Sequence, residues 1–216
     1  MDVLIVAGGK PETWPPLGNF DYYVGVDRGA WYLLQRECPL DLAIGDFDSL
    51  TPTELNRVQN SAQKMASAPP EKDDTDTQLA LQEVFRKHPT ANVTLIGATG
   101  GRLDHLLANL WVALEPRFTP YIRQIRIADW QNQVDFFAPG SYQLKQHAPM
   151  KYLAFCCLTA VDALSISGAK YSLTKKDVLV PTSYASNEFV AHSVAFSFTK
   201  GVLAVIQSRD IDELGR

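Results

Sequence analysis

The sequence predicts an α/β protein in which a Rossmann-like domain with a mostly parallel sheet is followed by a smaller antiparallel β-sandwich domain. Up to about residue 130, continuous apolar runs alternate with helical patterns, which is typical of parallel strands covered on both faces. After about residue 133, short β-rich segments are separated by Pro, Gly, Ser and Asn. We place the boundary near Ala138-Pro139-Gly140, so that the domains comprise residues 1–137 and 138–216.

In the first domain, short apolar runs predict strands at residues 3–7, 22–26, 40–44, 63–66, 93–96 and 125–128. A helix is expected over residues 30–36. Another begins after Thr51, because Thr51 and Glu54 have the spacing of a capping box and Pro52 suits the first helical position. Two further helices carry residues at helical spacing, namely Leu81, Val84, Phe85 and His88 in one and Leu103, Leu106, Leu107, Leu110 and Leu114 in the other.

The second domain is expected to be a small antiparallel sandwich or barrel. Its strand candidates are residues 134–137, 152–158, 164–166, 171–173, 178–180, 192–198 and 202–208. Thr199-Lys200-Gly201 predicts a hairpin between the last two of these strands.

The composition excludes several classes of function. The chain has 216 residues, 46% hydrophobic and 20% charged, with a net charge of -4 and no basic run, which argues against nucleic-acid binding. No apolar stretch approaches the roughly 20 residues that span a bilayer, and the first apolar run suits a strand better than a signal peptide. Three cysteines without metal-ligand spacing indicate a reducing compartment, the cytoplasm.

Acidic residues form three short clusters, which are Asp46 and Asp48, then Asp73, Asp74 and Asp76, and finally Asp104 after Gly100-Gly101-Arg102. Each cluster lies where a strand should end and a helix begin, which is where an α/β protein builds a phosphate and Mg²⁺ site. Concentrated negative charge is unfavourable unless a cation neutralises it, and hard oxygen ligands select Mg²⁺ over zinc. The first hypothesis is therefore metal-assisted phosphate chemistry.

The first two clusters also have a structural interpretation. Asp46 and Asp48 could form an Asx turn that leads into the next helix. Asp74 or Thr75 could be a helix N-cap, with Asp76 as a first-turn acid that complements the helix dipole. These alternatives remain open at the level of the sequence.

The third cluster follows a glycine-rich loop at residues 97–101, which permits close backbone approach to phosphate at a helix N-terminus. Arg102 and, from the second cluster, Lys72 are cations that suit phosphate oxygens. His105 taken alone is more often a surface residue, and Asn109 could continue a polar helix face. The chain has no P-loop motif, no acid about 20 residues after this loop for a ribose, and no motif for a covalent nucleophile.

Five ordered motifs resemble those of the thiamine pyrophosphokinase family, which transfers the β,γ-diphosphate of ATP to thiamine and releases AMP. The motifs are Val26-Asp27-Arg28-Gly29-Ala30, Gly45-Asp46-Phe47-Asp48-Ser49, Lys72-Asp73-Asp74-Thr75-Asp76-Thr77-Gln78, residues 97–109, and Gly168-Ala169-Lys170-Tyr171 with Ser186-Asn187-Glu188-Phe189. The resemblance implies a Rossmann-like catalytic domain that binds nucleotide and metal. It also implies a β-sandwich that binds thiamine and forms a homodimer, with thiamine in clefts between subunits.

The resemblance also implies a role for each matching residue. Mg²⁺ would be held by Asp46, Asp48 and Asp76, with Asp73 and Asp104 as further candidates. The nucleotide would be bound by Asp27, Lys72, Thr75, Thr99, Gly100, Gly101, Arg102 and His105. Thiamine would be bound by Gln78, Tyr171, Ser186 and Asn187, although Ala169 and Tyr184-Ala185 depart from the family's usual residues.

In the implied reaction, the thiamine hydroxyl attacks the β-phosphorus of ATP and AMP leaves, with Mg²⁺ and Arg102 stabilising the developing charge. Asp104 or Asp73 could accept the hydroxyl proton, and the sequence does not choose between them. Two other functions fit the acidic loops. One is transfer from ATP to another small alcohol, and the other is a sensor of nucleotide or thiamine phosphate without catalytic activity.

Overall fold

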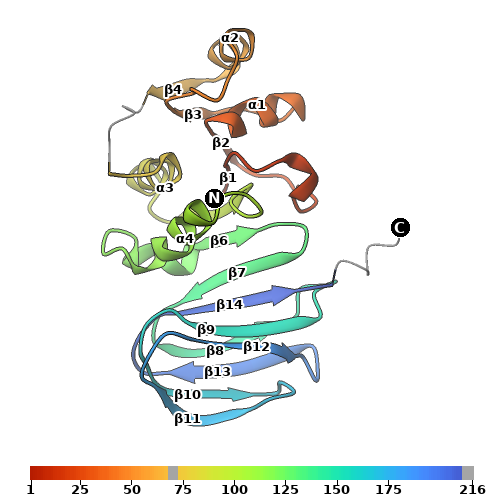
Figure 1. The fold of residues 1–216 in the computed structure, drawn as a ribbon, viewed down its shortest axis with the longest axis vertical. Coiled ribbons are helices and arrows are strands. Elements are labelled where there is room, and N and C mark those ends of the chain that lie inside the picture. The colour runs from red at the N-terminus through yellow and green to blue at the C-terminus, as the bar shows by residue number, and fades with distance from the viewer. Residues whose placement is uncertain (68–72, 211–216) are drawn as a thin grey trace. The chain divides into compact units, whose positions relative to one another are not determined.

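The computed structural model describes residues 1–67 and 73–210 (Figure 1). The chain forms two compact units that divide after Trp130. The boundary expected from the sequence, near residue 138, lies instead at the end of strand β7 (Asn132–Phe137). Strand β7 pairs with β14 (Leu203–Ser208) and belongs with it to the second unit. No helix among the described residues is long and apolar enough to cross a membrane.

The sheet of the first unit contains the six predicted strands, in the order β6-β5-β1-β2-β3-β4. They are β1 (Asp2–Val6), β2 (Tyr22–Val26), β3 (Leu42–Gly45), β4 (Lys64–Ser67), β5 (Asn92–Ile96) and β6 (Ile125–Ala128). All neighbouring pairs are parallel. The chain builds outward from β1 through β2 to β4 and then returns to β1's other side with β5, so the strand order reverses beside β1. In open parallel sheets, ligands bind at the carboxyl ends of the strands beside such a reversal.

Helices follow most of these strands, as predicted. They are α1 (Arg28–Gln35), α2 (Pro52–Ser61), α3 (Asp76–Lys87) and α4 (Leu103–Trp111), with 3-10 turns η1 (Pro11–Thr13), η2 (Val112–Leu114) and η3 (Thr119–Gln124). The capping box at α2 is confirmed, because the Thr51 hydroxyl accepts from the Glu54 N–H and the Glu54 carboxylate accepts from the Thr51 N–H. The apolar face expected for α3 is also confirmed, since Leu81, Val84 and Phe85 are buried.

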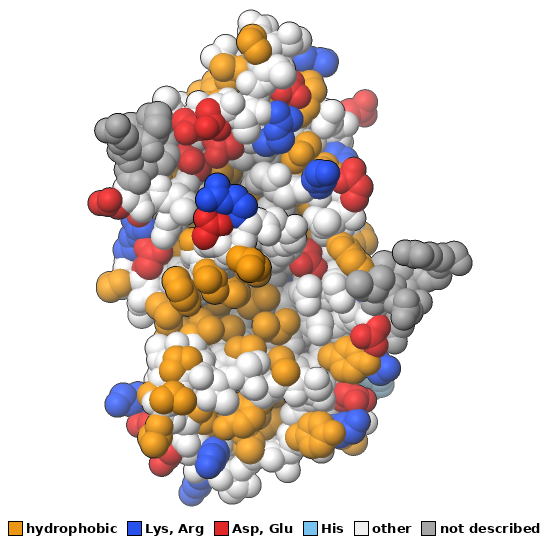
Figure 2. All heavy atoms as spheres, in the orientation of Figure 1, with side chains coloured by type: hydrophobic (Ala, Val, Ile, Leu, Met, Phe, Trp, Pro, Cys, Tyr) orange, Lys and Arg blue, Asp and Glu red, His pale blue; other side chains and the backbone are white. Residues whose placement is uncertain are grey.

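The buried face of α4 differs from the expectation. Leu103 is 75% exposed and Leu107 is 43% exposed, whereas Asn109 is only 6% exposed. The Asn109 amide donates a 2.9 Å hydrogen bond to the carbonyl oxygen of Ala98, and this bond turns the polar side of α4 toward the loop after β5. Asn109 thus belongs to a polar face of α4, but this face is turned toward the protein interior at Asn109 and not toward solvent. Large hydrophobic side chains of α4 are thus exposed at the surface of the first unit, and Figure 2 shows hydrophobic side chains on this side of the unit.

The second unit is a sandwich of two antiparallel sheets, with strand orders β12-β9-β14-β7 and β11-β10-β13-β8. The strands not yet given are β8 (Gly140–Lys145), β9 (Tyr152–Cys157), β10 (Val161–Ser167), β11 (Leu173–Val178), β12 (Thr182–Glu188) and β13 (Ser193–Phe198). A core between the sheets includes Phe137, Leu153, Phe155, Phe196 and Val205. The expectation of an antiparallel sandwich is confirmed.

Three details of this unit differ from the predictions. The turn at residues 199–201 is not a hairpin, because β13 pairs with β8 and β10 whereas β14 pairs with β7 and β9. The turn instead passes from one sheet to the other. The two strands expected at 171–173 and 178–180 are replaced by the single strand β11, so Tyr171 precedes this strand and residues 179–180 follow it. Strands β8 and β12 were not predicted, because half-exposed polar residues occupy much of both edge strands.

Candidate functional site

A cavity of about 410 Å³ lies in the first unit, where loops follow the carboxyl ends of its strands. Its walls come from the segments after β1, β2, β3 and β5 and from the starts of α3 and α4. The lining residues are Ala7, Gly8, Gly9, Val26, Asp27, Arg28, Asp48, Ser49, Thr75, Asp76, Thr77, Gly97, Ala98, Thr99, Gly101, Arg102, His105 and Asn109. The cavity thus occupies the strand-order reversal, and it collects residues from all three acidic motifs.

Two glycine loops form one wall of the cavity. The Gly9 N–H donates a 2.8 Å hydrogen bond to the carbonyl oxygen of Gly97, and a Cβ added to Gly9 would lie 2.5 Å from that oxygen. Gly97 has φ +64° and Gly100 has φ +74°, values that favour glycine. Because no side chains separate these loops, backbone groups line the wall and a phosphate could approach them closely. Gly8 and Gly9 were not recognised from the sequence.

Asp27 holds the ends of β2 and β3 together. It has φ +46°, its N–H donates to the Ile44 carbonyl oxygen at 3.0 Å, and its Oδ1 accepts from the Phe47 N–H at 3.2 Å. The same carboxylate fills the space where a Cβ of Gly45 would stand, and Gly45 has φ +146°. Asp27 therefore lines the cavity and also shapes the turn that carries the first acidic cluster.

The first cluster forms the Asx turn that the sequence left open. Asp46 Oδ1 accepts a 3.1 Å hydrogen bond from the Asp48 N–H, and Phe47 between them is buried. Asp48 lines the cavity, and Asp46 is half-buried beside it without lining it. A carboxylate has more than one acceptor position, so the turn leaves Asp46 able to accept further contacts.

The carboxylates at the cavity suit a hard cation. Among the described residues, no group of three or more His, Cys, Asp and Glu lies close enough together to hold a metal ion by itself. Mg²⁺ does not require such a group, because it keeps several waters and is usually bound by one or two carboxylates together with phosphate oxygens. Asp48, after β3, and Asp76, at the start of α3, both line this cavity, and carboxylates are donor groups that fit Mg²⁺. Asp73 and Asp104 do not line it.

The second cluster begins α3, and most of its polar groups are already engaged. Thr75 is the N-cap, and its hydroxyl accepts from the Gln78 N–H at 3.2 Å while Gln78 Oε1 accepts from the Thr75 N–H at 2.7 Å. Asp74 receives two hydrogen bonds from Arg117, at 2.7 and 2.6 Å, and these bonds raise the pKa of the guanidinium. Lys72, the proposed phosphate partner, lies outside the described residues.

The third cluster places one cation at the cavity. Arg102 makes two hydrogen bonds to Asp104, at 3.1 and 2.6 Å, and both side chains are exposed. This pair raises the pKa of Arg102 and lowers that of Asp104. Arg102 and His105 line the cavity. Since the ion pair is exposed, water and salt screen it, and the guanidinium can exchange Asp104 for another anion at little cost.

Two further polar residues at this site were not found from the sequence. Asp129 follows β6 and is 8% exposed, and one of its carboxylate oxygens accepts a 2.6 Å hydrogen bond from the Thr99 hydroxyl. Arg28 pairs with Glu54 at 3.4 Å and donates to the carbonyl oxygen of Ser49. An acid at a strand end was the signal used for the three clusters, so Asp129 could have been found in the same way.

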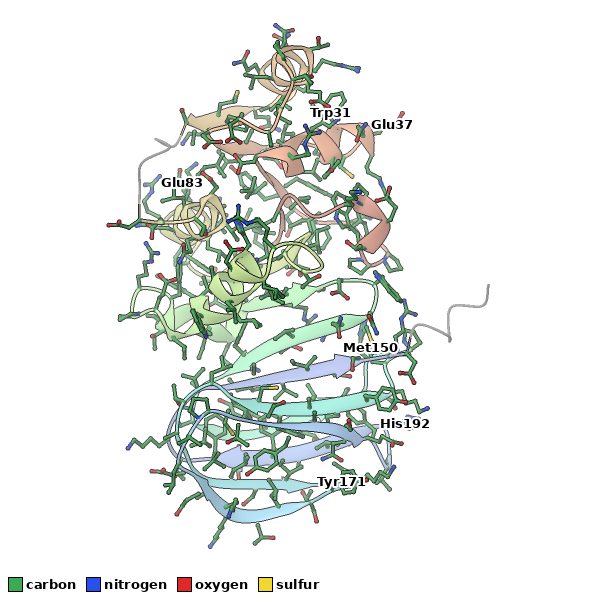
Figure 3. The ribbon with its side chains drawn as sticks, in the orientation of Figure 1. Trp31, Glu37, Glu83, Met150, Tyr171 and His192 are labelled. Atoms are coloured by element: carbon green, nitrogen blue, oxygen red, sulfur yellow. The ribbon has the colours of Figure 1, made fainter. Side chains whose placement is uncertain are left out.

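Two residues of the second unit that are expected to bind thiamine, Tyr171 and Asn187, differ in exposure. Tyr171, labelled in Figure 3, is 59% exposed and lines a cavity of about 170 Å³ with Leu173, Tyr184 and Asn187. The Asn187 amide is buried, accepting from the Tyr171 N–H at 2.9 Å and donating to the Tyr171 carbonyl oxygen at 2.8 Å. Asn187 therefore fixes the backbone of Tyr171.

The other two residues expected to bind thiamine, Ser186 and Gln78, lie in different surroundings. Ser186 is exposed, has φ +58°, and lines a separate open hollow beside Tyr152 and Asp210. The Gln78 amide belongs to the first unit. It accepts from the Thr75 N–H and donates to Glu115, and it does not line the cavity of the first unit. These two bonds fix the orientation of the amide and leave one N–H and one acceptor position for a ligand.

Comparisons with known proteins agree over both units. A family model described as "Thiamin pyrophosphokinase, catalytic domain" matches residues 16–125, and one described as "Thiamin pyrophosphokinase, vitamin B1 binding domain" matches residues 141–203. The thiamine pyrophosphokinase of Bacillus subtilis is 34% identical over 212 residues, which are 95% of this chain and 98% of that protein.

Solved structures extend the similarity to the fold. A crystal structure of a thiamin pyrophosphokinase family protein from Enterococcus faecalis is 54% identical, with a TM-score of 0.95 over 97% of this chain and 100% of that chain. The crystal structure of yeast thiamin pyrophosphokinase is 15% identical, with a TM-score of 0.76 over 99% of this chain and 87% of that chain, so it shares the fold.

Proposed function

Since this chain belongs to the thiamin pyrophosphokinase family, we propose that it catalyses the Mg²⁺-dependent transfer of diphosphate from ATP to thiamine, giving thiamine diphosphate and AMP. One observation carries the details of this proposal. The cavity of the first unit combines glycine loops, the carboxylates of Asp27, Asp48 and Asp76, and the cations Arg28 and Arg102 at the strand-order reversal. Backbone amides and cations suit the triphosphate, and the carboxylates suit its metal ion.

The triphosphate would lie against the loop at residues 97–101. Gly100 and Gly101 have open space beside their α-carbons, so the backbone is accessible there. Arg102 would leave Asp104 and pair with phosphate oxygens, for which a planar guanidinium is well shaped. Thr99 would act through its position, because its hydroxyl donates to Asp129. Asp27 and Thr75 would likewise support the cavity wall through their backbone contacts.

Asp48 and Asp76 would hold Mg²⁺ together with phosphate oxygens, and Asp46 would add a further oxygen from the same turn. When bound, the ion would neutralise charge that develops on the transferring group. The metal site would then be shared between protein and nucleotide, which is the usual arrangement for Mg²⁺.

In the reaction, the hydroxyl oxygen of thiamine would form a bond to the β-phosphorus while the bond between the β-phosphorus and the α,β-bridging oxygen breaks. The hydroxyl proton would pass to a carboxylate, for which we favour Asp104 over Asp73, because Asp104 contacts the cavity-lining Arg102. Pairing with Arg102 lowers the pKa of Asp104. If Arg102 moved to phosphate, that cause would be lost and Asp104 would become a stronger base.

Thiamine would be recognised in the second unit by Tyr171, whose exposed ring can face the cationic heterocycle. Asn187 would set the position of this ring through its two bonds to the Tyr171 backbone, and Ser186 would offer a hydroxyl nearby in sequence. We also propose a homodimer and a cytoplasmic location, the latter because Cys38, Cys156 and Cys157 are all free thiols. A solution mass of twice 24.0 kDa by light scattering would support the dimer, and 24.0 kDa at assay concentration would contradict it.

The decisive assay incubates the purified protein with ATP, Mg²⁺ and thiamine and separates the products by chromatography. Equal amounts of thiamine diphosphate and AMP are expected. Formation of ADP would indicate single phosphoryl transfer, and AMP formed only with another alcohol would indicate a different acceptor. Binding of nucleotide without any AMP would indicate a sensor. Asp76→Asn provides a matched control for contaminating activity, because it removes one cavity carboxylate and keeps the side-chain size.

A further inference from the structure

We propose that Arg117 is a positioning residue for the metal and phosphate site, and that it acts by holding Asp74 and the first turn of α3. The inference rests on the proposed function above. Arg117 does not line the cavity of the first unit described above. It lies 43 residues after Asp74 in the chain, and nothing in the acidic motifs points to it. Its contacts lead to Asp76, which begins α3 and lines the cavity.

The guanidinium of Arg117 is held from three sides. Nη1 and Nη2 donate to the two carboxylate oxygens of Asp74, at 2.7 and 2.6 Å, and Nε donates to Glu115 Oε2 at 2.8 Å. The guanidinium carbon also lies 4.8 Å from the ring centre of Phe118, which is 1% exposed. The fork is therefore anchored against the core, and its two parallel bonds fix the direction of the Asp74 carboxylate.

A second chain of contacts joins the same cluster to the start of α3. Glu115 Oε1 accepts from the Gln78 amide at 2.5 Å, and Gln78 Oε1 accepts from the Thr75 N–H at 2.7 Å. Asp74 and Thr75 are consecutive, so the residues just before Asp76 are tied to Arg117 directly and through Glu115 and Gln78. A shift of Arg117 would move the helix start, and with it the Asp76 carboxylate.

The arrangement also gives two neighbouring carboxylates different environments, because Arg117 pairs with Asp74 while Asp76 lines the cavity. Residues 73–76 contain three aspartates, but only Asp76 lines the cavity. Without Arg117, Asp74 would be a negatively charged group two residues from Asp76, able to repel the triphosphate and to compete for its cation. Arg117 neutralises this carboxylate and keeps both of its oxygens occupied. Residues that orient a metal ligand in this way typically change metal affinity or activity about 10- to 100-fold when they are replaced.

The test measures Mn²⁺ binding by electron paramagnetic resonance, with Mn²⁺ as a stand-in for Mg²⁺, in the presence of α,β-methylene-ATP. Arg117→Gln should weaken Mn²⁺ binding about tenfold and lower kcat/KM for ATP by a similar factor. The double variant Arg117→Gln/Asp74→Asn should bind Mn²⁺ more tightly than Arg117→Gln, because the competing charge is removed. Such recovery in a double-mutant cycle would not follow from a loss of stability alone.

Arg86→Gln is the matched control. Arg86 pairs with Glu83 at 2.9 Å near the other end of α3 and does not line the cavity that contains Asp76, so this variant removes an ion pair from the same helix. It should bind Mn²⁺ like the parent. Thermal unfolding of every variant without nucleotide separates stability from positioning. If Arg117→Gln does not fold, Arg117→Lys serves instead, because it keeps the charge but loses the fork, and intermediate weakening is expected.

Mn²⁺ binding equal to the parent in Arg117→Gln, or in Arg117→Lys where only that variant folds, would overturn the positioning role and leave Arg117 as a stabilising residue. A double variant that binds no better than Arg117→Gln would overturn the separation of the two carboxylates. If the parent itself binds no Mn²⁺ with the nucleotide analogue, the proposed metal site fails, and the positioning role fails with it. Mn²⁺ binding by the parent thus tests the proposed metal site, and the comparison of the Arg117 variants with the parent tests the positioning role.

Discussion

The hydroxyl of Thr99 donates a 2.6 Å hydrogen bond to the carboxylate of Asp129, and this bond joins the loops that follow β5 and β6. Asp129 is 8% exposed, so its charge depends on protein donors more than on water. The bond also fixes a side chain in the middle of the loop at residues 97–101, which we propose binds phosphate. One contact thereby links the stability of the loops after β5 and β6 to the shape of the cavity.

Thr99→Val should reduce the free energy of unfolding by about 1 to 3 kcal/mol, because it keeps the side-chain shape but removes a donor from a buried carboxylate. It should also raise the KM for ATP more than that for thiamine. Urea denaturation and steady-state kinetics measure the two effects. Thr99→Ser keeps the hydroxyl and should resemble the parent. Equal stability of the Val and Ser variants would show that the bond contributes nothing.

Asp46→Asn and Asp48→Asn should each lower kcat at least about 100-fold through loss of charge at the metal. Asparagine at position 46 can still accept the hydrogen bond from the Asp48 N–H, so the Asx turn should survive. Circular dichroism checks the fold, and a Mg²⁺ titration of the rate checks the site. Turnover near that of the parent in Asp46→Asn would mean that Asp46 serves only the turn.

Arg102→Lys should lower kcat/KM for ATP about tenfold or more, although it keeps the positive charge. A guanidinium can bind two phosphate oxygens at once, whereas an ammonium group acts as a point charge. Stability should hardly change, because Arg102 and Asp104 are both exposed. Arg57→Lys is the control, since Arg57 lies over Trp31 outside the cavity. Unchanged kinetics in Arg102→Lys would show that Arg102 does not bind two phosphate oxygens through its guanidinium.

Tyr171→Ala should raise the KM for thiamine and leave that for ATP nearly unchanged. An aromatic ring attracts a cationic ligand by roughly 0.5 to 2 kcal/mol, which corresponds to about a 2- to 30-fold change. Tyr171→Phe keeps the ring and should behave like the parent. The Lys170 ammonium already lies 5.7 Å from the centre of this ring, so the lower part of the range is expected. An equal rise of both KM values would point to a structural defect.

The stability contributed by Glu83 should depend on pH. Hydrogen bonds from Arg86, Lys87 and Lys64 lower the pKa of Glu83 from 4.5 to about 2 (Figure 3 labels Glu83 on α3). Because the folded-state pKa is lowered, this stabilisation is fully present above pH 4.5 and is lost as the pH falls toward 2.

Glu83→Gln should therefore lower the free energy of unfolding at pH 7 by about 1 kcal/mol, a modest value because Lys64 and Arg86 are exposed and Lys87 is partly exposed. The difference from the parent should shrink between pH 4.5 and pH 2. Chemical denaturation across this range measures it. A difference that stays constant with pH would mean that packing, and not charge, is lost in the variant.

The parallel sheet could be predicted from the sequence because strands covered on both faces appear as continuous apolar runs. Edge strands of the sandwich were harder, since β8 alternates half-buried and exposed residues and contains few large apolar side chains. The supposed hairpin at residues 199–201 shows a further limit. Turn residues indicate that the chain reverses, but they do not indicate which sheet the next strand joins.

The acidic loops could be predicted because each one is a local pattern at a strand end. Their partners could not, because Thr99 meets Asp129 30 residues away and Asp74 meets Arg117 43 residues away. Nothing local distinguishes Arg117 from any surface arginine. Asn187 shows the converse, because its motif drew attention to thiamine while its amide is occupied by the Tyr171 backbone.

Asp27 and Gly45 occupy a single volume between them, since the carboxylate of one stands where the other would carry a side chain. The residues that one position tolerates therefore depend on the residue at the other. A side chain introduced at position 45 should destabilise the fold, because φ +146° disfavours it and the Asp27 carboxylate would have to move. A smaller residue at position 27 would open the space but remove the Phe47 contact. The effects on stability of substitutions at positions 27 and 45 should consequently be non-additive. A combinatorial library of both positions should show strong epistasis between them.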